Sequence, residues 1–372
     1  MFGPFRRPPT PDTDYGQAEL ELRTARDRAL AGDWAAARNL IEATGRDWEL
    51  RGRRLSVLGT AAGQSPHWLD AWAAGAPHDP TVAILRADAL MDQAGEARGA
   101  ASARNTSREQ FQEFARLSTL AAQASEHAVE LNPDDPYPWA TRLTSMLANG
   151  HRQRDEFLAT MGEAVTRDPY NFETHLMAAT FLCEKWYGSH EEMFAAAREP
   201  AAAAPVGSSV AMLPLLAHFE YALREYGFDT RAESLTAKAS YFRRPEVIRE
   251  IEACAAKWRG AGEPRLIGRG ITLRHWLALA NYLAGHDRKG TRALLTQIGP
   301  YLGSTAVYGM SVCSFRQLPA TRIQFTVRPV GGFTTDATPI LAITRRLPRQ
   351  PGDQQVRQRR HRRRPVLFGQ GR

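Results

Sequence analysis

Ala128-Val129-Glu130-Leu131-Asn132-Pro133 is followed, 36 residues further along the chain, by Ala164-Val165-Thr166-Arg167-Asp168-Pro169. A third proline, Pro205, continues the same interval. A residue that precedes proline is pushed out of the helical region of backbone torsions, so each of these steps predicts the end of a helix. Self-similarity at a period of this length is typical of stacked helix pairs.

Apolar periodicity predicts further helices on both sides of this segment. The clearest antiparallel pairs are 136–149 with 151–167 and 171–186 with 190–203. The other expected helices are 16–31, 34–44, 47–62, 67–75, 80–98, 107–131, 208–226, 230–242, 245–259, 271–284 and 289–299. We therefore predict an all-α fold, a right-handed α-solenoid of antiparallel helix pairs.

Short polar phrases predict where several helices begin and end. Leu30-Ala31-Gly32-Asp33 recurs as Leu283-Ala284-Gly285-His286-Asp287, and glycine there allows a left-handed C-cap between antiparallel helices. Thr106 and Glu109 have the spacing of a capping box at the start of the helix 107–131. These phrases indicate helical hairpins at both ends of the body.

The positive charge is concentrated at the C-terminal end. Residues 311–372 contain 13 Arg and two Asp but no Lys or Glu, a net charge of +11, which leaves −3 of the chain's +8 for residues 1–310. We predict a disordered Pro/Arg arm over 1–15, the solenoid over 16–305 and a low-order Arg-rich tail over 306–372. Within the tail, Thr321–Arg328 alternates like a strand without an obvious partner. The same composition also fits an out-of-frame translation product.

The positions in the 36-residue unit resemble the tetratricopeptide-repeat superfamily. Pro133 and Pro169 stand where that family ends its second helix, Ala164 matches its small residue, and Trp139 matches its first-helix aromatic. Leu143 stands where the family has a glycine. The resemblance implies a divergent, tetratricopeptide-like array that binds a partner protein.

The string Lys185-Trp186-Tyr187-Gly188-Ser189 is similar to a turn in uncharacterised actinobacterial helical proteins of unknown function. One interpretation is a partner-binding lip, and we name Trp139, Arg142, Lys185 and Trp186 as candidate contacts on the concave face. The alternative is a rigid turn, in which Gly188 supplies permissive torsions and Ser189 caps the next helix.

The sequence contains no spacing typical of a catalytic, metal or cofactor site. Ten His and three Cys include no His-x-x-x-His, His-Glu-x-x-His or Cys-x-x-Cys pattern, and there is no phosphate-binding loop. His175 and His218 lie inside apolar helices, where we expect hydrogen-bonded packing residues. We therefore predict no catalytic residues, no metal and no cofactor, and we expect a protein that is not an enzyme.

The leading hypothesis is a non-enzymatic scaffold that holds a protein or peptide partner on the concave face of the array. The alternative is a polyanion or nucleic-acid-associated factor that acts only through the tail. Its candidate residues are Arg357, Arg359, Arg360, Arg362, Arg363 and Arg364. A third hypothesis, a hydrolase or transferase in a helical fold, requires a pocket with perturbed titratable groups. With no long apolar segment and unpatterned cysteines, we expect a cytoplasmic protein without a membrane partner.

Overall fold

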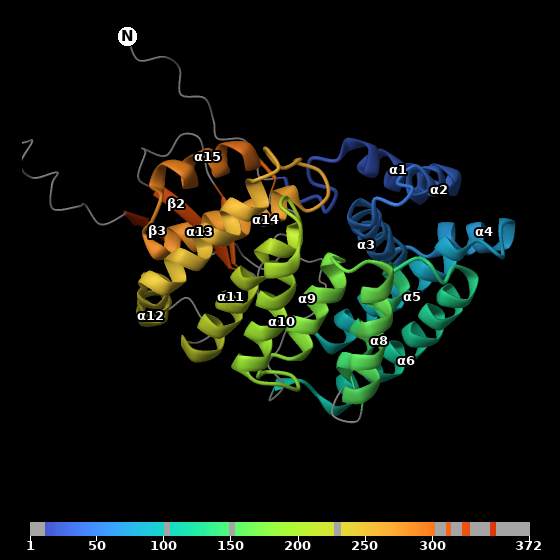
Figure 1. Cartoon of the computed structure of the whole chain (residues 1–372). Coiled ribbons are helices and arrows are strands. Elements are labelled where there is room, and N and C mark those ends of the chain that lie inside the picture. The colour runs from blue at the N-terminus through green and yellow to red at the C-terminus, as the bar shows by residue number, and fades with distance from the viewer. Residues whose placement is uncertain are drawn as a thin grey trace, which may run out of the picture.

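The computed structural model describes residues 12–99, 105–148, 153–226, 232–301, 310–313, 322–327 and 343–346. The body is helical, as predicted (Figure 1). The helices within these ranges are α1 (Leu20–Leu30), α2 (Trp34–Glu42), α3 (Trp48–Gln64), α4 (His67–Gly75), α5 (Pro80–Arg98), α6 (Arg108–Leu131), α7 (Tyr137–Ser145), α8 (Arg154–Arg167), α9 (Phe172–Phe181), α10 (His190–Ala203), α11 (Leu213–Tyr226), α12 (Ala232–Phe242), α13 (Pro245–Arg259), α14 (Gly270–Ala284) and α15 (Arg288–Ile298), with 3₁₀ turns η2 (Met146–Ala148) and η4 (Ser209–Met212).

The prolines end helices where the sequence predicts. Helix α6 ends at Leu131 and α8 at Arg167, and the residue before each proline leaves helical torsions. Asp168, for example, has φ −143° and ψ 99°, the extended conformation that proline imposes on its predecessor. Helix α10 ends at Ala203, two residues before Pro205. The prediction that helices end at these prolines, 36 residues apart, is therefore confirmed.

One of the predicted caps is confirmed, and another is displaced by one residue. Gly285 closes α14 in the left-handed conformation with φ +64°, as the recurring phrase predicts. At α6, however, the capping box is formed by Ser107 and Gln110, so the prediction of Thr106 and Glu109 is wrong. The hydroxyl of Ser107 accepts a hydrogen bond from the backbone amide of Gln110, and the side-chain oxygen of Gln110 accepts one from the backbone amide of Ser107.

The middle helices pack as pairs in two layers. Helix α5 packs on α6, α7 on α8 and α9 on α10. Helices α3, α5, α7 and α9 also pack successively on one another, and we call these four helices the inner layer. In Figure 1 the chain follows an arc, so that the first helices and α14 and α15 lie on the same side, at the top of the view.

Contacts between distant residues close this arc across the inner layer. Asp47, which caps α3, accepts a 3.0 Å contact from Arg265, and Glu49 accepts a 2.5 Å hydrogen bond from Ser209. The amide of Asp12 donates to the carbonyl of Pro300 over 2.8 Å. Residues 12–15, which we expected within the arm, therefore contact the body, while 1–11 lie outside the described residues.

Apolar side chains fill the space between the layers in several clusters. Leu143 of α7, Met146 of the following 3₁₀ turn and Phe157 of α8 belong to one of them, in agreement with the predicted pairing of 136–149 with 151–167. Phe181 from α9 joins the same cluster and stacks on Phe157, with ring centroids 3.8 Å apart. The larger clusters surround α11 with α14 and α3 with α5. Burial of such apolar area is the main favourable term in folding.

Three short strands follow the helices. They are β1 (Met310–Cys313), β2 (Arg322–Val327) and β3 (Ile343–Arg346), joined as an antiparallel sheet in the order β1-β2-β3. The strand predicted over 321–328 thus exists as β2. It has two partners where the sequence offered none, because Met310 pairs with Val327 and Arg322 with Arg346.

Candidate functional site

A cleft lies on the inner layer, between α3, α5, α7 and α9, with a volume of about 180 Å³. Carboxylate, hydroxyl and apolar groups share its wall, and we call it the acidic cleft. Its lining residues are Ser56, Thr60, Asp88, Met91, Asp92, Tyr137, Ala140, Thr141, Thr144, Glu173, Leu176 and Met177.

Two glycines of α3 allow the acidic residues of α5 to come close. A Cβ on Gly59 would lie 2.4 Å from the Cβ of Asp88, and a Cβ on Gly63 would lie 3.0 Å from Oδ2 of Asp92. Both pairs are four residues apart in their helices, so each glycine faces one carboxylate on a shared seam. The close approach of α3 and α5 therefore fixes both aspartates at the cleft.

Asp88 is held by two hydroxyl groups. Its Oδ2 accepts a 2.8 Å hydrogen bond from the phenol of Tyr137, and its Oδ1 accepts a 2.9 Å bond from Thr141. Burial raises the pKa of Asp88 to about 6, although both hydrogen bonds oppose the rise. Burial, together with the Asp88 charge, also raises the pKa of Tyr137 well above its usual range, so the phenol remains a donor.

Asp92 is more deeply buried and less well satisfied. The residue is only 3% exposed, and its Oδ1 has one long contact of 3.4 Å from Thr60. The other oxygen, Oδ2, is buried without a hydrogen-bond partner. Burial raises the pKa of Asp92 to about 7, and the carboxylates of Glu96 and Asp88 add to the rise. Perturbed carboxyl groups in a cleft are typical of functional sites.

Asp92 differs from every other buried acidic residue in the described part of the chain, because it has no cationic partner. The paired residues are Asp135 with Arg51 at 2.8 Å, Glu19 with Arg54 at 2.6 Å, and Glu220 with Lys185. A buried carboxylate without such a partner is costly, so structural acids are normally neutralised in this way. The carboxylate of Asp92 therefore has no compensating positive charge in the folded chain.

The arginine at the edge of the cleft is already engaged. Arg269 forms an ion pair with Glu173 and lies over the ring of Phe172, 4.5 Å from its centroid. Burial lowers the pKa of Arg269 to about 10, while the charge of Glu49 opposes this change. Arg269 therefore compensates acidic groups at the rim and does not neutralise the carboxylates of α5.

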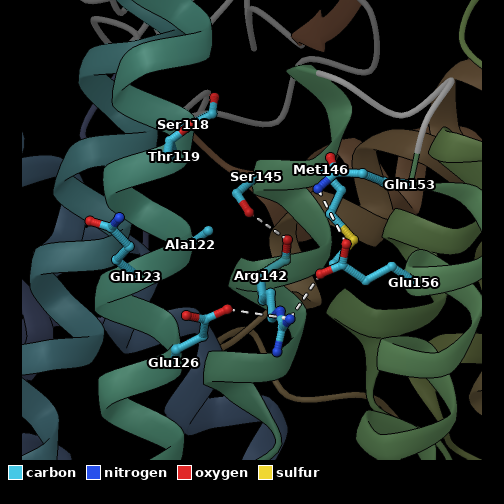
Figure 2. A pocket seen from close by; sticks show the side chains of 10 residues that line it. All are labelled: Ser118, Thr119, Ala122, Gln123, Glu126, Arg142, Ser145, Met146, Gln153 and Glu156. Atoms are coloured by element: carbon cyan, nitrogen blue, oxygen red, sulfur yellow. Dashed lines mark hydrogen bonds and ion pairs between the residues drawn. The ribbon is translucent and has the colours of Figure 1, made fainter.

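A second cavity of about 280 Å³ lies between α6, α7 and α8. Figure 2 shows Arg142 of α7 pointing between Glu126 of α6, at 3.3 Å, and Glu156 of α8, at 2.9 Å. The remaining lining residues are Ser118, Thr119, Ala122, Gln123, Ser145, Met146 and Gln153. Both carboxylates of this cavity thus share a cationic partner within the chain.

The four predicted contact residues do not line the acidic cleft. Arg142 lies in the second cavity (Figure 2). Trp139 is covered by Arg167, whose guanidinium lies 4.3 Å from the ring centroid. Lys185 forms an ion pair with the buried Glu220. Trp186 is half-buried against the largest apolar cluster. The structure therefore uses all four in packing or in ion pairs and does not gather them into one surface.

The turn 185–189 has the capping role that the alternative interpretation gave it. The hydroxyl of Ser189 accepts from the amide of Glu192 at the start of α10. Gly188, however, does not adopt a positive φ, so the expected reason for glycine is wrong. A Cβ there would lie 2.1 Å from the carbonyl oxygen of Leu182, and glycine is needed because the backbone passes so close.

The two histidines inside apolar helices make hydrogen bonds, as predicted. Nε2 of His175 contacts the carbonyl of Pro169 at 2.8 Å. His218 is 2% exposed and lies between the phenol of Tyr241 at 2.6 Å and Glu250 at 2.9 Å. Burial would raise the pKa of Glu250, but His218 and Arg198 stabilise its charge and lower the pKa to about 2.

Among the residues that the structure describes, one group of side chains could hold a metal ion, and its members come from three segments. Nε2 of His190 lies 2.8 Å from Glu184 and 3.0 Å from Glu225. The sequence pattern misses this group because no two members have the spacing of a metal motif. Arg224 contacts Glu184 at 3.3 Å, so one of the two carboxylates already has a cationic partner within the chain.

Comparison with known proteins gives no relative for this chain: no family model matches it, and no curated protein is significantly similar. Within the part that the structure describes, no helix has the length and apolar character needed to cross a bilayer. The six arginines proposed for polyanion binding, 357, 359, 360 and 362–364, lie outside the described residues, and that alternative stays a hypothesis.

The residues of the acidic cleft were not predicted from the sequence. The available signal was local: Asp88 and Asp92 stand four residues apart among the buried apolar residues of α5, while Gly59 and Gly63 have the same spacing in α3. Polar pairs at helical spacing in a buried helix indicate a special environment. The spacing of the two aspartates does not, however, identify α3 as the helix that packs against them.

Proposed function

We propose that this protein is a non-enzymatic interaction scaffold, a right-handed, tetratricopeptide-like solenoid whose inner, concave side holds a protein or peptide partner. The observation that carries the proposal is the acidic cleft, in which Asp92 keeps a buried oxygen without a partner. Groups left unsatisfied by folding, on the layer that stacked pairs present to a ligand, favour binding from outside.

The size of the cleft supports a binding role for a side chain. Pockets for drug-sized ligands and cofactors have volumes of roughly 300 to 1,000 Å³. The acidic cleft has about 180 Å³, which is below that range. It therefore fits one side chain of a larger partner better than a whole cofactor, and the remaining affinity would come from the surrounding inner layer.

The chemistry of the cleft favours binding over catalysis. Asp88 and Asp92 have the raised pKa values that the enzyme hypothesis requires. The lining contains no imidazole, thiol or amine, and the hydroxyls of Tyr137 and Thr141 already donate to Asp88. The hydroxyl of Thr60 lies 3.4 Å from Oδ1 of Asp92, a longer contact than an activating base makes with its nucleophile, so the carboxyl groups serve better as a charged binding surface.

We also propose that the protein works in the cytoplasm. Cys183 and Cys254 are buried free thiols, and burial raises the pKa of each to about 12. Buried protonated thiols behave as small apolar side chains and need no oxidising compartment.

A matched pair of variants tests the scaffold proposal. Thr144 lines the cleft and donates to the carbonyl of Ala140 over 3.0 Å, while the exposed Thr166 of α8 makes the same bond to Gly162 over 2.9 Å. Each would be replaced by Tyr in the full chain, which is then used to isolate partners from cell extract. We expect Thr144→Tyr to lose partners that the wild type and Thr166→Tyr retain. Equal recovery with both variants would contradict binding on the inner layer.

A further inference from the structure

We propose that the acidic cleft binds the ammonium group of a lysine side chain from the partner protein. The inference rests on the proposed function, because it names the group that the inner layer recognises. Its basis is the charge of the cleft. Two neighbouring aspartates of α5 line it, and among the described residues no lysine, arginine or histidine forms an ion pair with either of them.

The unpaired oxygen of Asp92 requires a donor from outside the chain. As a carboxylate, Asp92 leaves Oδ2 without a hydrogen-bond donor. As an acid protonated on Oδ1, it would donate toward the hydroxyl of Thr60, and Oδ2 would still lack a donor. Neither protonation state satisfies this side chain, which is 97% buried. A bound donor with a positive charge satisfies it and compensates Asp88 as well.

The geometry favours an ammonium over a guanidinium. A guanidinium binds best as a fork on both oxygens of one carboxylate. Both oxygens of Asp88 already accept hydroxyl bonds, and Oδ1 of Asp92 faces Thr60, so no carboxylate has two open oxygens. An ammonium is a compact charge with three donors. It needs only one acceptor on Asp92, the buried oxygen that has no partner, and can use a further lone pair of Asp88.

The rest of the wall suits the chain that carries an ammonium. Met91, Ala140, Leu176 and Met177 supply apolar surface beside the carboxylates. Lysine buries its methylene stem on such surface while its charged end reaches polar groups. A metal ion fits less well, because within the described ranges the group that brings three metal ligands together is the one at His190, not the cleft.

Small cations test the chemistry of the site directly. The full chain is titrated at pH 8 with n-butylammonium, n-propylguanidinium and n-butanol, at constant ionic strength, by calorimetry and by the shift of the melting temperature. We expect n-butylammonium to bind and to raise the melting temperature, n-propylguanidinium to bind about tenfold more weakly, and n-butanol to have no effect. Equal binding of the two cations would overturn the assignment to an ammonium, and binding of neither would overturn the site.

Two variants and a control locate the binding. Asp92→Asn removes the charge with little change of shape, and we expect at least a tenfold loss of n-butylammonium affinity. Asp134→Asn makes the same change at an exposed turn and should bind like the wild type. Met177→Lys places an ammonium on the cleft wall from within the chain, so n-butylammonium should no longer bind. Binding that persists in both cleft variants would contradict the site, and circular dichroism confirms that each variant is folded.

A third arm separates this inference from the scaffold proposal. The tripeptide acetyl-Ala-Lys-Ala-amide is compared with the same peptide carrying acetyl-lysine, which removes the charge. Tighter binding of the unmodified peptide, lost in Asp92→Asn, supports a lysine ligand. If partners depend on Thr144 but not on Asp92, the scaffold proposal stands and the lysine inference fails. If the cations bind but no partner depends on Thr144, only the scaffold proposal fails.

Discussion

The two halves of α3 treat charge in opposite ways. In the first half, Arg51 and Arg54 reach buried carboxylates of other segments at 2.8 and 2.6 Å. In the second half, Gly59 and Gly63 carry no side chain and lie against the two aspartates of α5. The first half supplies arginines to the buried Asp135 and Glu19. The second half lies against the two aspartates of α5 and provides no cation.

This difference separates charges used for folding from charges available for binding. Removing one partner of a buried ion pair leaves an uncompensated charge, so the first half of α3 must keep its arginines to neutralise Asp135 and Glu19. The aspartates at the second half already bear that cost in the folded protein. Their charge makes the fold less stable, and this is expected of a site that awaits a ligand.

The largest expected effect is at the paired half. Asp135 is fully buried, and Arg51→Ala would leave its carboxylate without a cation. We expect a loss of about 3 to 5 kcal/mol in the free energy of unfolding, measured by urea denaturation. Arg86→Ala is the control, because its ion pair with Asp70 is exposed and should contribute at most about 1 kcal/mol. Similar losses in both variants would remove the distinction between the two kinds of pair.

The sequence predicts the helices of this protein well because their ends are set locally. Asn132 and Asp168 precede prolines, and Gly285 takes a left-handed cap, so the information lies within a few residues. The closing contacts are of another kind. Glu49 and Ser209 are 160 residues apart, and no periodicity indicates that they meet.

The acidic cleft was missed for the same physical reason. Asp88 and Asp92 are informative only when α3 is known to lie against them, and the glycines that permit this belong to a separate helix. The contact residues predicted at the turn 185–189 were chosen for their type. Type alone does not show whether Lys185, which forms an ion pair with Glu220, also contacts a partner.

A second prediction tests whether the glycine seam positions the acids. Gly59→Ala places a methyl group 2.4 Å from the Cβ of Asp88, an atom close to the backbone that cannot rotate away. We expect a destabilisation of about 1 to 3 kcal/mol from overpacking, together with weaker n-butylammonium binding. Gly162→Ala in α8 is the control, since nothing lies within 4 Å and alanine favours helix by about 1 kcal/mol. A stabilised Gly59→Ala variant would show that the seam is not tight.

A third prediction concerns the unpaired half. Because burial raises the pKa of Asp92 to about 7, the folded state holds its proton more tightly than the unfolded state, whose carboxyl titrates near 3.8. The tighter proton binding stabilises the folded state. This stabilisation is fully present below the unfolded pKa and is lost as the pH rises through about 7. Asp92→Asn should therefore be more stable than the wild type at pH 8, by about 1 kcal/mol or more, with a much smaller difference at pH 5. Urea denaturation at both pH values measures it, and a variant that is less stable at pH 8 would refute an unpaired charge.

The smallest expected effect comes from Glu96, one helical turn beyond Asp92 on the exposed side of α5. After burial, its charge is the next cause of the raised pKa of Asp92. Glu96→Gln removes a like charge at i,i+4, so the fold should gain about 0.2 to 0.5 kcal/mol at pH 8. The pKa of Asp92 should move below about 7, toward its ordinary value, which an NMR titration of the carboxyl carbon can follow. Asp92 should still bind n-butylammonium in this variant, because the unpaired oxygen is unchanged. If the pKa of Asp92 were unchanged in Glu96→Gln, burial alone would set that pKa, and the exposed charge of Glu96 would have no effect on it.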